Sequence, residues 1–201
     1  MSILDSLPQR IEDASAWVGP DMAANPDRWL MKLELNEIAG LHQAADHFLG
    51  LGKDIGEITA GDFPLDKLAM HFTELRQKLI HGYGVEVLRG LDVTNMPRAK
   101  AAAIFCGIGA HLGAARSQNA EGHILGHVRD TGANASDTKT RIYQTSQRQT
   151  FHTDSADVVG LLCLQDAQEG GLSLLVSATS IYNRMRVERP DLVLSRLCSG
   201  L

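Results

Sequence analysis

The sequence is poor in cysteine, and its cysteines follow no recognisable spacing. Three cysteines occur, Cys106, Cys163 and Cys198, and no two of them form a C-x-x-C pair. Their odd number and wide separation argue against a disulfide framework and against a zinc knuckle. We therefore expect a reducing environment, and the cytoplasm is the predicted location.

Other features that are absent exclude further classes of protein. No apolar run is long enough to cross a bilayer, and the first residues lack the cationic start and apolar stretch of a signal peptide. The net charge of -5 comes with scattered lysines and arginines, so no broad basic surface is available for phosphates. We predict neither a membrane nor a nucleic-acid partner, and instead a soluble protein that binds a small-molecule substrate.

A length of 201 residues suits a single domain, and residues 1–35 are predicted to be an irregular lead-in because prolines and polar residues interrupt any pattern. Apolar residues at helical spacing predict helices over 35–50, 65–82 and 94–113. Between the second and third, residues 83–90 alternate as a half-buried strand does. Glu86 is expected to lie on the polar face of that strand.

The second half of the chain has the composition of loops and strands. Residues 118–137 are rich in glycine, asparagine and serine, which is typical of loops. Three stretches rich in β-branched and apolar residues predict strands over 141–154, 158–165 and 172–178. A final helix is expected over 180–192, with Thr179 as a possible N-terminal cap.

One short motif carries chemistry. In a strand, side chains two residues apart point to the same face, so His152 and Asp154 would present an imidazole and a carboxylate together. Two histidines and one carboxylate on one face of Fe(II) form the facial triad of iron oxygenases. A single His-x-Asp has little specificity, and a surface histidine beside a solvated aspartate is the ordinary alternative. Here, however, the motif begins an apolar strand, and a glycine turn would bring Ser173 back beside it.

Residues 141–192, which contain the sequences "TFHTD" and "EGGLSLL", resemble the central part of the taurine dioxygenase-like (TauD/TfdA) family of Fe(II)- and 2-oxoglutarate-dependent oxygenases. Residues 81–93 and 109–130 also resemble the early strand and the loop region of that family, so the resemblance covers roughly 65–195. It implies an α+β fold built on a double-stranded β-helix, a jelly roll of the clavaminate synthase-like type, with flanking helices.

The resemblance also implies a site. His152 and Asp154 would be metal ligands for Fe(II), and Ser173 would donate a hydrogen bond to the co-substrate 2-oxoglutarate. Gly170 and Gly171 would form the turn before it. A carboxylate at position 154 points to hydroxylation and not to halogenation. Four polar residues near the motif in sequence are candidate substrate contacts: Asn119, Gln144, Gln147 and Arg148.

The pattern of the family is incomplete in this sequence. No histidine follows His152, so the second histidine ligand of the family and the arginine after it have no counterpart. We therefore expect residues 1–201 to be a single partial domain, C-terminally truncated and inactive alone. A non-catalytic pseudoenzyme or remnant that acts as a binding or interaction module is the alternative. Completion by a partner is a third, because an open sheet edge would favour a homo-oligomer.

Overall fold

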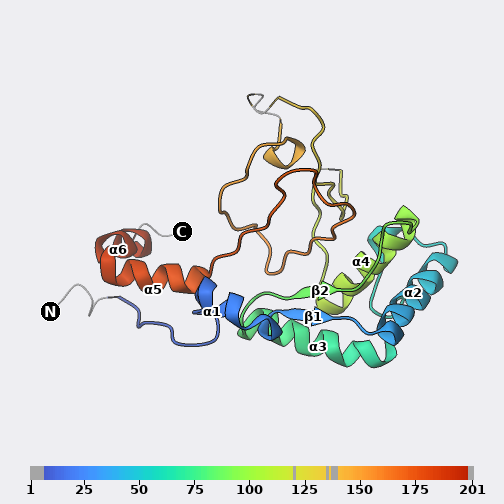
Figure 1. Cartoon of the computed structure of the whole chain (residues 1–201), viewed down its shortest axis with the longest axis horizontal. Helices are drawn as coiled ribbons and strands as arrows, with labels where there is room; N and C mark the ends of the chain where they lie inside the picture. The colour runs from blue at the N-terminus through green and yellow to red at the C-terminus, as the bar shows by residue number, and fades with distance from the viewer. Residues whose placement is uncertain (1–6, 120, 135, 137–139, 199–201) are drawn as a thin grey trace.

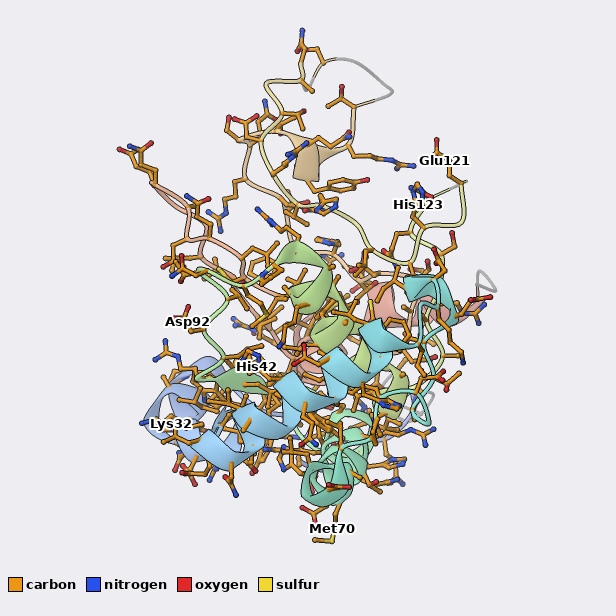
Figure 2. All side chains as sticks on the ribbon, turned by 90° about the vertical axis from the view of Figure 1, so that its right-hand side faces the viewer. Lys32, His42, Met70, Asp92, Glu121 and His123 are labelled. Atoms are coloured by element: carbon orange, nitrogen blue, oxygen red, sulfur yellow. The ribbon has the colours of Figure 1, made fainter. Side chains whose placement is uncertain are left out.

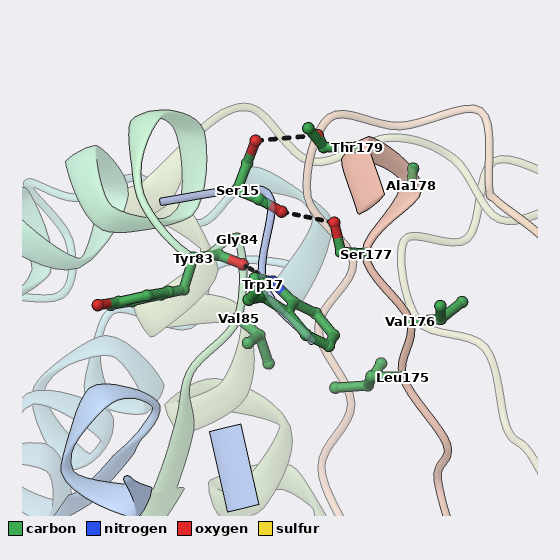
Figure 3. Close-up of a pocket in the computed structure, with 10 residues that line it drawn as sticks. All are labelled: Ser15, Trp17, Tyr83, Gly84, Val85, Leu175, Val176, Ser177, Ala178 and Thr179. Carbon is green, nitrogen blue, oxygen red and sulfur yellow. Dashed lines mark hydrogen bonds between the residues drawn. The ribbon is translucent and has the colours of Figure 1, made fainter. Parts of the chain in front are cut away.

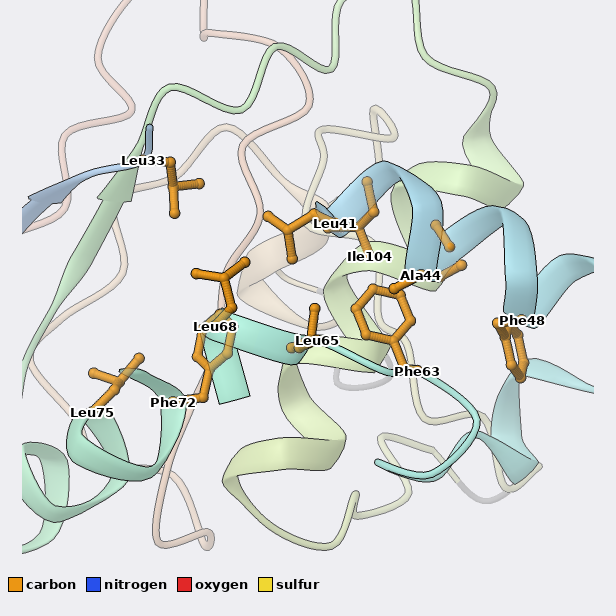
Figure 4. Close-up of a cluster of buried hydrophobic side chains, with 12 residues drawn as sticks. Leu33, Leu41, Ala44, Phe48, Phe63, Leu65, Leu68, Phe72, Leu75 and Ile104 are labelled. Carbon is orange, nitrogen blue, oxygen red and sulfur yellow. The ribbon is translucent and has the colours of Figure 1, made fainter. Parts of the chain in front are cut away.

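Three helices surround the hydrophobic core of the computed structural model, which describes residues 7–119, 121–134, 136 and 140–198. They are α2 (Leu35–Gly50), α3 (Asp66–His81) and α4 (Arg98–Leu112), and Figure 1 shows them grouped together. The buried side chains come mainly from these helices and the loops between them (Figure 4). All three helices predicted from apolar spacing are thus confirmed.

The helices form where a local signal and an apolar stripe coincide. In α2, Leu41, Ala45 and Phe48 lie on one face and are buried, and the first turn is closed by Glu34 and Glu37, each of whose side chains accepts a backbone N–H of the other residue. The third helix, α3, buries Leu68, Phe72 and Leu75 in the same way. Tertiary burial of these stripes stabilises the helices far more than propensity does.

The contact between α4 and the loop before α3 is unusually close. The ring of Phe63 is fully buried and lies directly over Gly107 of α4. A Cβ atom at position 107 would lie 2.3 Å from a ring carbon of Phe63, which is far inside van der Waals contact. Only glycine allows the helix and the ring to approach this closely.

A short parallel sheet joins the two ends of the α2–α3 region. Strand β1 (Leu30–Lys32) pairs with β2 (Val87–Arg89), with Met31 opposite Leu88. The two strands run in parallel because α2 and α3 form the crossover between them. The predicted strand over 83–90 is confirmed in part as β2. The lead-in expected to be irregular holds β1, the helix α1 (Gly19–Ala24) and the 3-10 turn η2 (Pro26–Arg28); a further such turn, η3 (Ile55–Glu57), follows α2.

The strands predicted over 141–154, 158–165 and 172–178 are wrong in this structure. Between 140 and 177 the only regular element is the 3-10 turn η4 (Ile142–Gln144). A strand exists only through its ladder, and the backbone of residues 146–176 makes no backbone hydrogen bond to any residue that the structure describes. We call residues 151–176 the apolar arm, because its large side chains are exposed: Phe151, Val158, Val159, Leu161, Leu172, Leu174, Leu175 and Val176.

The last helix is divided in two. Helix α5 (Ala178–Glu188) ends before Arg189, and Pro190 begins α6 (Pro190–Cys198), because proline is tolerated in a first helical turn but not in a helix interior. The cap of α5 is Ser177 and not Thr179, since Oγ of Ser177 accepts the N–H of Ser180 at 2.9 Å. Within the described ranges, none of the helices is both long and apolar enough to span a membrane.

Candidate metal centre

The structure brings His152 and Asp154 together. Nε2 of His152 lies 4.0 Å from Oδ1 of Asp154. On the other side of the ring, Nδ1 lies 2.8 Å from the carbonyl oxygen of Thr150. A carbonyl oxygen can only accept, so Nδ1 donates to it, and Nε2 accepts from the side-chain amide nitrogen of Gln149, which can only donate, at 3.2 Å. This is the tautomer that a metal-binding histidine needs, with its second nitrogen held by a backbone carbonyl.

The donor set is nevertheless incomplete. The side chains of His152 and Asp154 are 45% and 56% exposed, so both are open to solvent. Among the residues that the structure describes, no group of three or more histidine, cysteine, aspartate or glutamate side chains could hold a metal ion. Two donors therefore fit Fe(II) in type and tautomer, and the described residues supply no third.

The glycine turn before Ser173 has the expected backbone. Gly170 and Gly171 both have φ of +72°, in the left-handed region that favours glycine. At Gly171 a Cβ would also lie 2.8 Å from that of Ala167, so both the backbone angle and the lack of space disfavour a side chain there. Ser173 itself is exposed, and no hydrogen bond joins it to His152 or Asp154 in the part of the chain described. Its role towards 2-oxoglutarate stays a prediction.

The four candidate substrate contacts lie in two stretches, Asn119 in one and the other three within residues 144–148. Asn119 organises its own turn, because its Oδ1 accepts the backbone N–H groups of Glu121 and His123 at 3.1 and 3.0 Å. Oε1 of Gln144 accepts the N–H of Arg141 at 2.9 Å and so closes η4. Gln147 and Arg148 are exposed. Asn119 and Gln144 thus have structural roles here, and substrate contact by any of the four stays a prediction.

An upstream histidine does not supply the missing ligand in this structure. Nδ1 of His123 lies 3.4 Å from Oε2 of Glu121 and 2.9 Å from Nδ2 of Asn119. His123 and Glu121 lie near each other on a loop that stands apart from helix α2 (Figure 2). His123 is therefore occupied by its own turn.

A buried charge cluster was not foreseen from the sequence. The Glu86 side chain, expected on a polar face, is only 3% exposed and pairs with Lys78, while its Oε1 lies 3.6 Å from Nε2 of His71. The alternation of residues in the predicted strand indicated the face on which Glu86 lies, but not that helix α3 covers this face. A signal was available, because His71 and Lys78 are two helical turns apart and so lie on one face of α3.

The comparison with protein families decides the affiliation. The model described as "Taurine catabolism dioxygenase TauD, TfdA family" matches residues 48–200, which is most of the chain. The chain belongs to the TauD/TfdA family. The resemblance drawn from the His-x-Asp and Gly-Gly motifs is thereby confirmed. Members of this family are in general Fe(II)- and 2-oxoglutarate-dependent dioxygenases with small-molecule substrates and a double-stranded β-helix.

Two curated proteins are similar to this chain over almost its whole length. FR-33289 synthase of Streptomyces rubellomurinus is 28% identical over 192 residues, which cover 95% of this chain and 56% of the relative. Taurine hydroxylase-like protein SAT17 of Stachybotrys chartarum is 30% identical over 195 residues, covering 93% of this chain and 50% of the relative. The chain spans about half the length of both relatives.

The TauD/TfdA affiliation and the structure agree only in part on the fold. The family implies a jelly roll, whereas the described residues contain two short parallel strands and several helices. The upstream part of the chain is helical, and residues 151–176, which carry the His-x-Asp motif, form neither helix nor strand. His152 and Asp154 are thus close together, but the residues that the structure describes do not form a jelly roll around them.

Proposed function

We propose that this chain carries the His-x-Asp half of the iron site of a hydroxylase-type, Fe(II)- and 2-oxoglutarate-dependent dioxygenase that acts on a small organic substrate. The observation that carries the proposal is the tautomer of His152. Its Nδ1 donates to the carbonyl of Thr150, and its Nε2 accepts from the amide of Gln149 and lies 4.0 Å from Oδ1 of Asp154. Membership of the TauD/TfdA family supports the choice of metal.

Each residue would have a definite task. His152 and Asp154 would hold the metal ion, and Thr150 would keep the imidazole in the binding tautomer. Fe(II) with 2-oxoglutarate, when bound, supplies the oxidising chemistry that these residues cannot. Ser173 would donate a hydrogen bond to a carboxylate of 2-oxoglutarate, and Asp154 would keep halide from the metal position it fills. The second histidine ligand of the family, and with it the arginine that follows that histidine, have no counterpart within residues 153–201.

The remaining proposals concern the state of the chain. We propose that residues 1–201 form one partial domain of the jelly-roll type in the cytoplasm, and that the apolar arm favours self-association. The exposure of its leucines and valines supports the last point, because soluble monomers rarely leave large apolar patches open. The substrate class is not narrower than a small organic molecule, since the activities in the names of the two relatives belong to those proteins.

A specific observation also favours the alternative, a non-catalytic binding or interaction module. The two candidate ligands lie on an exposed stretch, and no third donor stands near them among the described residues. Two exposed ligands would bind Fe(II) only weakly. A non-catalytic module would not depend on bound iron, so weak binding is compatible with it.

Anaerobic titration separates the two functions. Fe(II) and then 2-oxoglutarate are added to the purified chain, and the visible charge-transfer band of the chelated complex is recorded. The proposal expects a band in the wild type and in His123→Ala, whose histidine lies on another loop, but none in His152→Ala. No bound iron in the wild type would contradict the proposal and leave the non-catalytic module.

A further inference from the structure

The N-terminal segment 8–17, which we call the strap, lies along helix α5. The carbonyl of Pro8 accepts from the Tyr182 hydroxyl at 2.8 Å, and the backbone of Ile11 makes two hydrogen bonds to the Asn183 amide at 3.0 and 2.7 Å. Further along, the Ser180 hydroxyl donates to the carbonyl of Trp17 at 2.6 Å. Residues more than 160 positions apart are thus tied by side chains that grip backbone atoms.

The gripping side chains follow the surface of α5. Ser180, Asn183 and Arg186 are spaced by three residues, so they lie along one face of the helix. Arg186 completes the row by donating from Nε to the carbonyl of Pro8 at 2.9 Å. None of the residues in α5 is buried, so hydrogen bonds hold the strap against α5 more than apolar packing does.

The strap is tied at its other end to the body of the protein. The indole Nε1 of Trp17 donates to the carbonyl of Tyr83 at 2.8 Å, just before β2. A cavity of about 230 Å³ lies at this junction, lined by residues from the strap, from 83–85 and from 175–179 (Figure 3). The strap therefore lies between the body and α5.

Ser177 is the central point of this junction. It is 5% exposed. Its hydroxyl donates to the carbonyl of Ser15 at 2.5 Å and accepts the N–H of Ser180, and Ser15 also donates to Oγ1 of Thr179 at 2.9 Å. One hydroxyl thus joins the strap, the cap of α5 and the end of the apolar arm.

We propose that Ser177 is a positioning residue and that the strap is a clasp for the arm that carries Ser173. Ser173 lies four residues before Ser177, so the fixed hydroxyl limits Ser173 to within about 14 Å of the junction. Releasing the clasp frees the arm and α5 without unfolding α2–α4. The part of this proposal that concerns 2-oxoglutarate rests on the function proposed for Ser173.

Hydrogen exchange tests the clasp without iron. In Ser177→Ala, exchange in helix α5, residues 178–188, is expected to accelerate about fivefold to tenfold, the change that one lost hydrogen bond produces, while α2–α4 keep their rates. Ser177→Thr keeps the hydroxyl and should restore slow exchange. Ser195→Ala is the matched control, since its hydroxyl donates only within α6, to Leu192. Unchanged exchange, or equal acceleration in α2–α4, would overturn the clasp.

The affinity for 2-oxoglutarate tests the positioning role. If the wild-type chain forms the iron complex, Ser177→Ala should weaken 2-oxoglutarate binding several-fold and leave Fe(II) affinity unchanged, and Ser177→Thr should recover it. If Ser177→Ala accelerates hydrogen exchange in α5 but leaves the 2-oxoglutarate affinity unchanged, the strap holds α5 as proposed, but Ser177 does not position Ser173. If the wild-type chain forms no complex with Fe(II) and 2-oxoglutarate, the function proposed for Ser173 is wrong, and so is the positioning role of Ser177. The hydrogen-exchange experiment would still show whether the strap holds α5.

Discussion

Nε2 of His152 and Oδ1 of Asp154 face each other across 4.0 Å, and the side chains that carry them are 45% and 56% exposed. A metal ion held there would keep water at most of its positions, because the two side chains can fill only two. Protein sites with few ligands and several waters are octahedral, whereas closed sites of nitrogen and sulfur ligands are tetrahedral.

The geometry of a bound metal is therefore the first prediction. Co(II) added anaerobically in place of Fe(II) should give the weak absorption of an octahedral complex, and Asp154→Asn should weaken the binding. An intense tetrahedral spectrum would mean that other ligands close the site, and it would contradict the assignment. Asp157→Asn, in the same exposed stretch, is the matched control and should bind Co(II) as the wild type does.

The buried Glu86 should matter for stability. Glu86→Gln leaves Lys78 and His71 without their carboxylate, and removing one partner of a buried ion pair is costly. Because a third of Lys78 is exposed and can turn to water, we expect a loss of about 2 kcal/mol in the free energy of unfolding. Urea unfolding measures it. Glu74 is exposed on α3, the helix that carries Lys78 and His71, so Glu74→Gln should change the stability little. Equal effects in the two variants would refute a special role for Glu86.

Two glycines of α4 should respond to alanine in opposite ways. Gly107→Ala forces a Cβ to within 2.3 Å of Phe63 and should cost about 2 to 3 kcal/mol through overpacking. Gly109→Ala meets nothing within 4 Å and should stabilise the helix by about 0.5 to 1 kcal/mol. Thermal unfolding of both variants checks the pair, and Phe63→Leu should relieve the first. A tolerated Gly107→Ala would mean that the ring can move away.

Two cysteines should differ sharply in reactivity. Burial raises the pKa of the Cys106 thiol to about 11, while Cys163 is exposed. At pH 8 only about one part in a thousand of Cys106 is thiolate, which is the reactive form. In a Cys198→Ser background, iodoacetamide should therefore label Cys163 first, as mass spectrometry of peptides would show. Prompt labelling of Cys106 in the folded chain would show that α4 opens readily.

The apolar arm should cause self-association. Leu172 and Leu174 are 87% and 56% exposed, and open strand-like segments with apolar side chains tend to pair. The double variant Leu172→Ser with Leu174→Ser should lower the sedimentation coefficient at high concentration towards that of a monomer. Met70→Ser removes a similarly exposed side chain from α3, far from the arm in sequence, and should not. A wild-type chain that remains monomeric throughout would contradict the homo-oligomer.

The helices could be predicted because their signals are local. Residues such as Leu41 and Phe48 repeat at the helical period, and their partners lie within the same small core. The strands over 158–165 and 172–178 could not be predicted in this way, because β-branched composition indicates a strand only if another strand lies beside it. The metal motif was found from its residue types, yet its assembly depends on those same missing pairings.

The rotation of α4 about its own axis depends on the absence of a Cβ atom at Gly107. Apolar residues surround most of this helix, and its buried positions, Ala101, Ala103, Ile104, Cys106 and Gly107, do not form one narrow stripe. Hydrophobic burial alone would accept several rotations of such a helix about its axis. Because Gly107 has no Cβ, the Phe63 ring can lie directly against the helix at that position, and a rotation by one residue would bring a Cβ against the ring. Gly107 thus fixes the face that α4 turns towards Phe63.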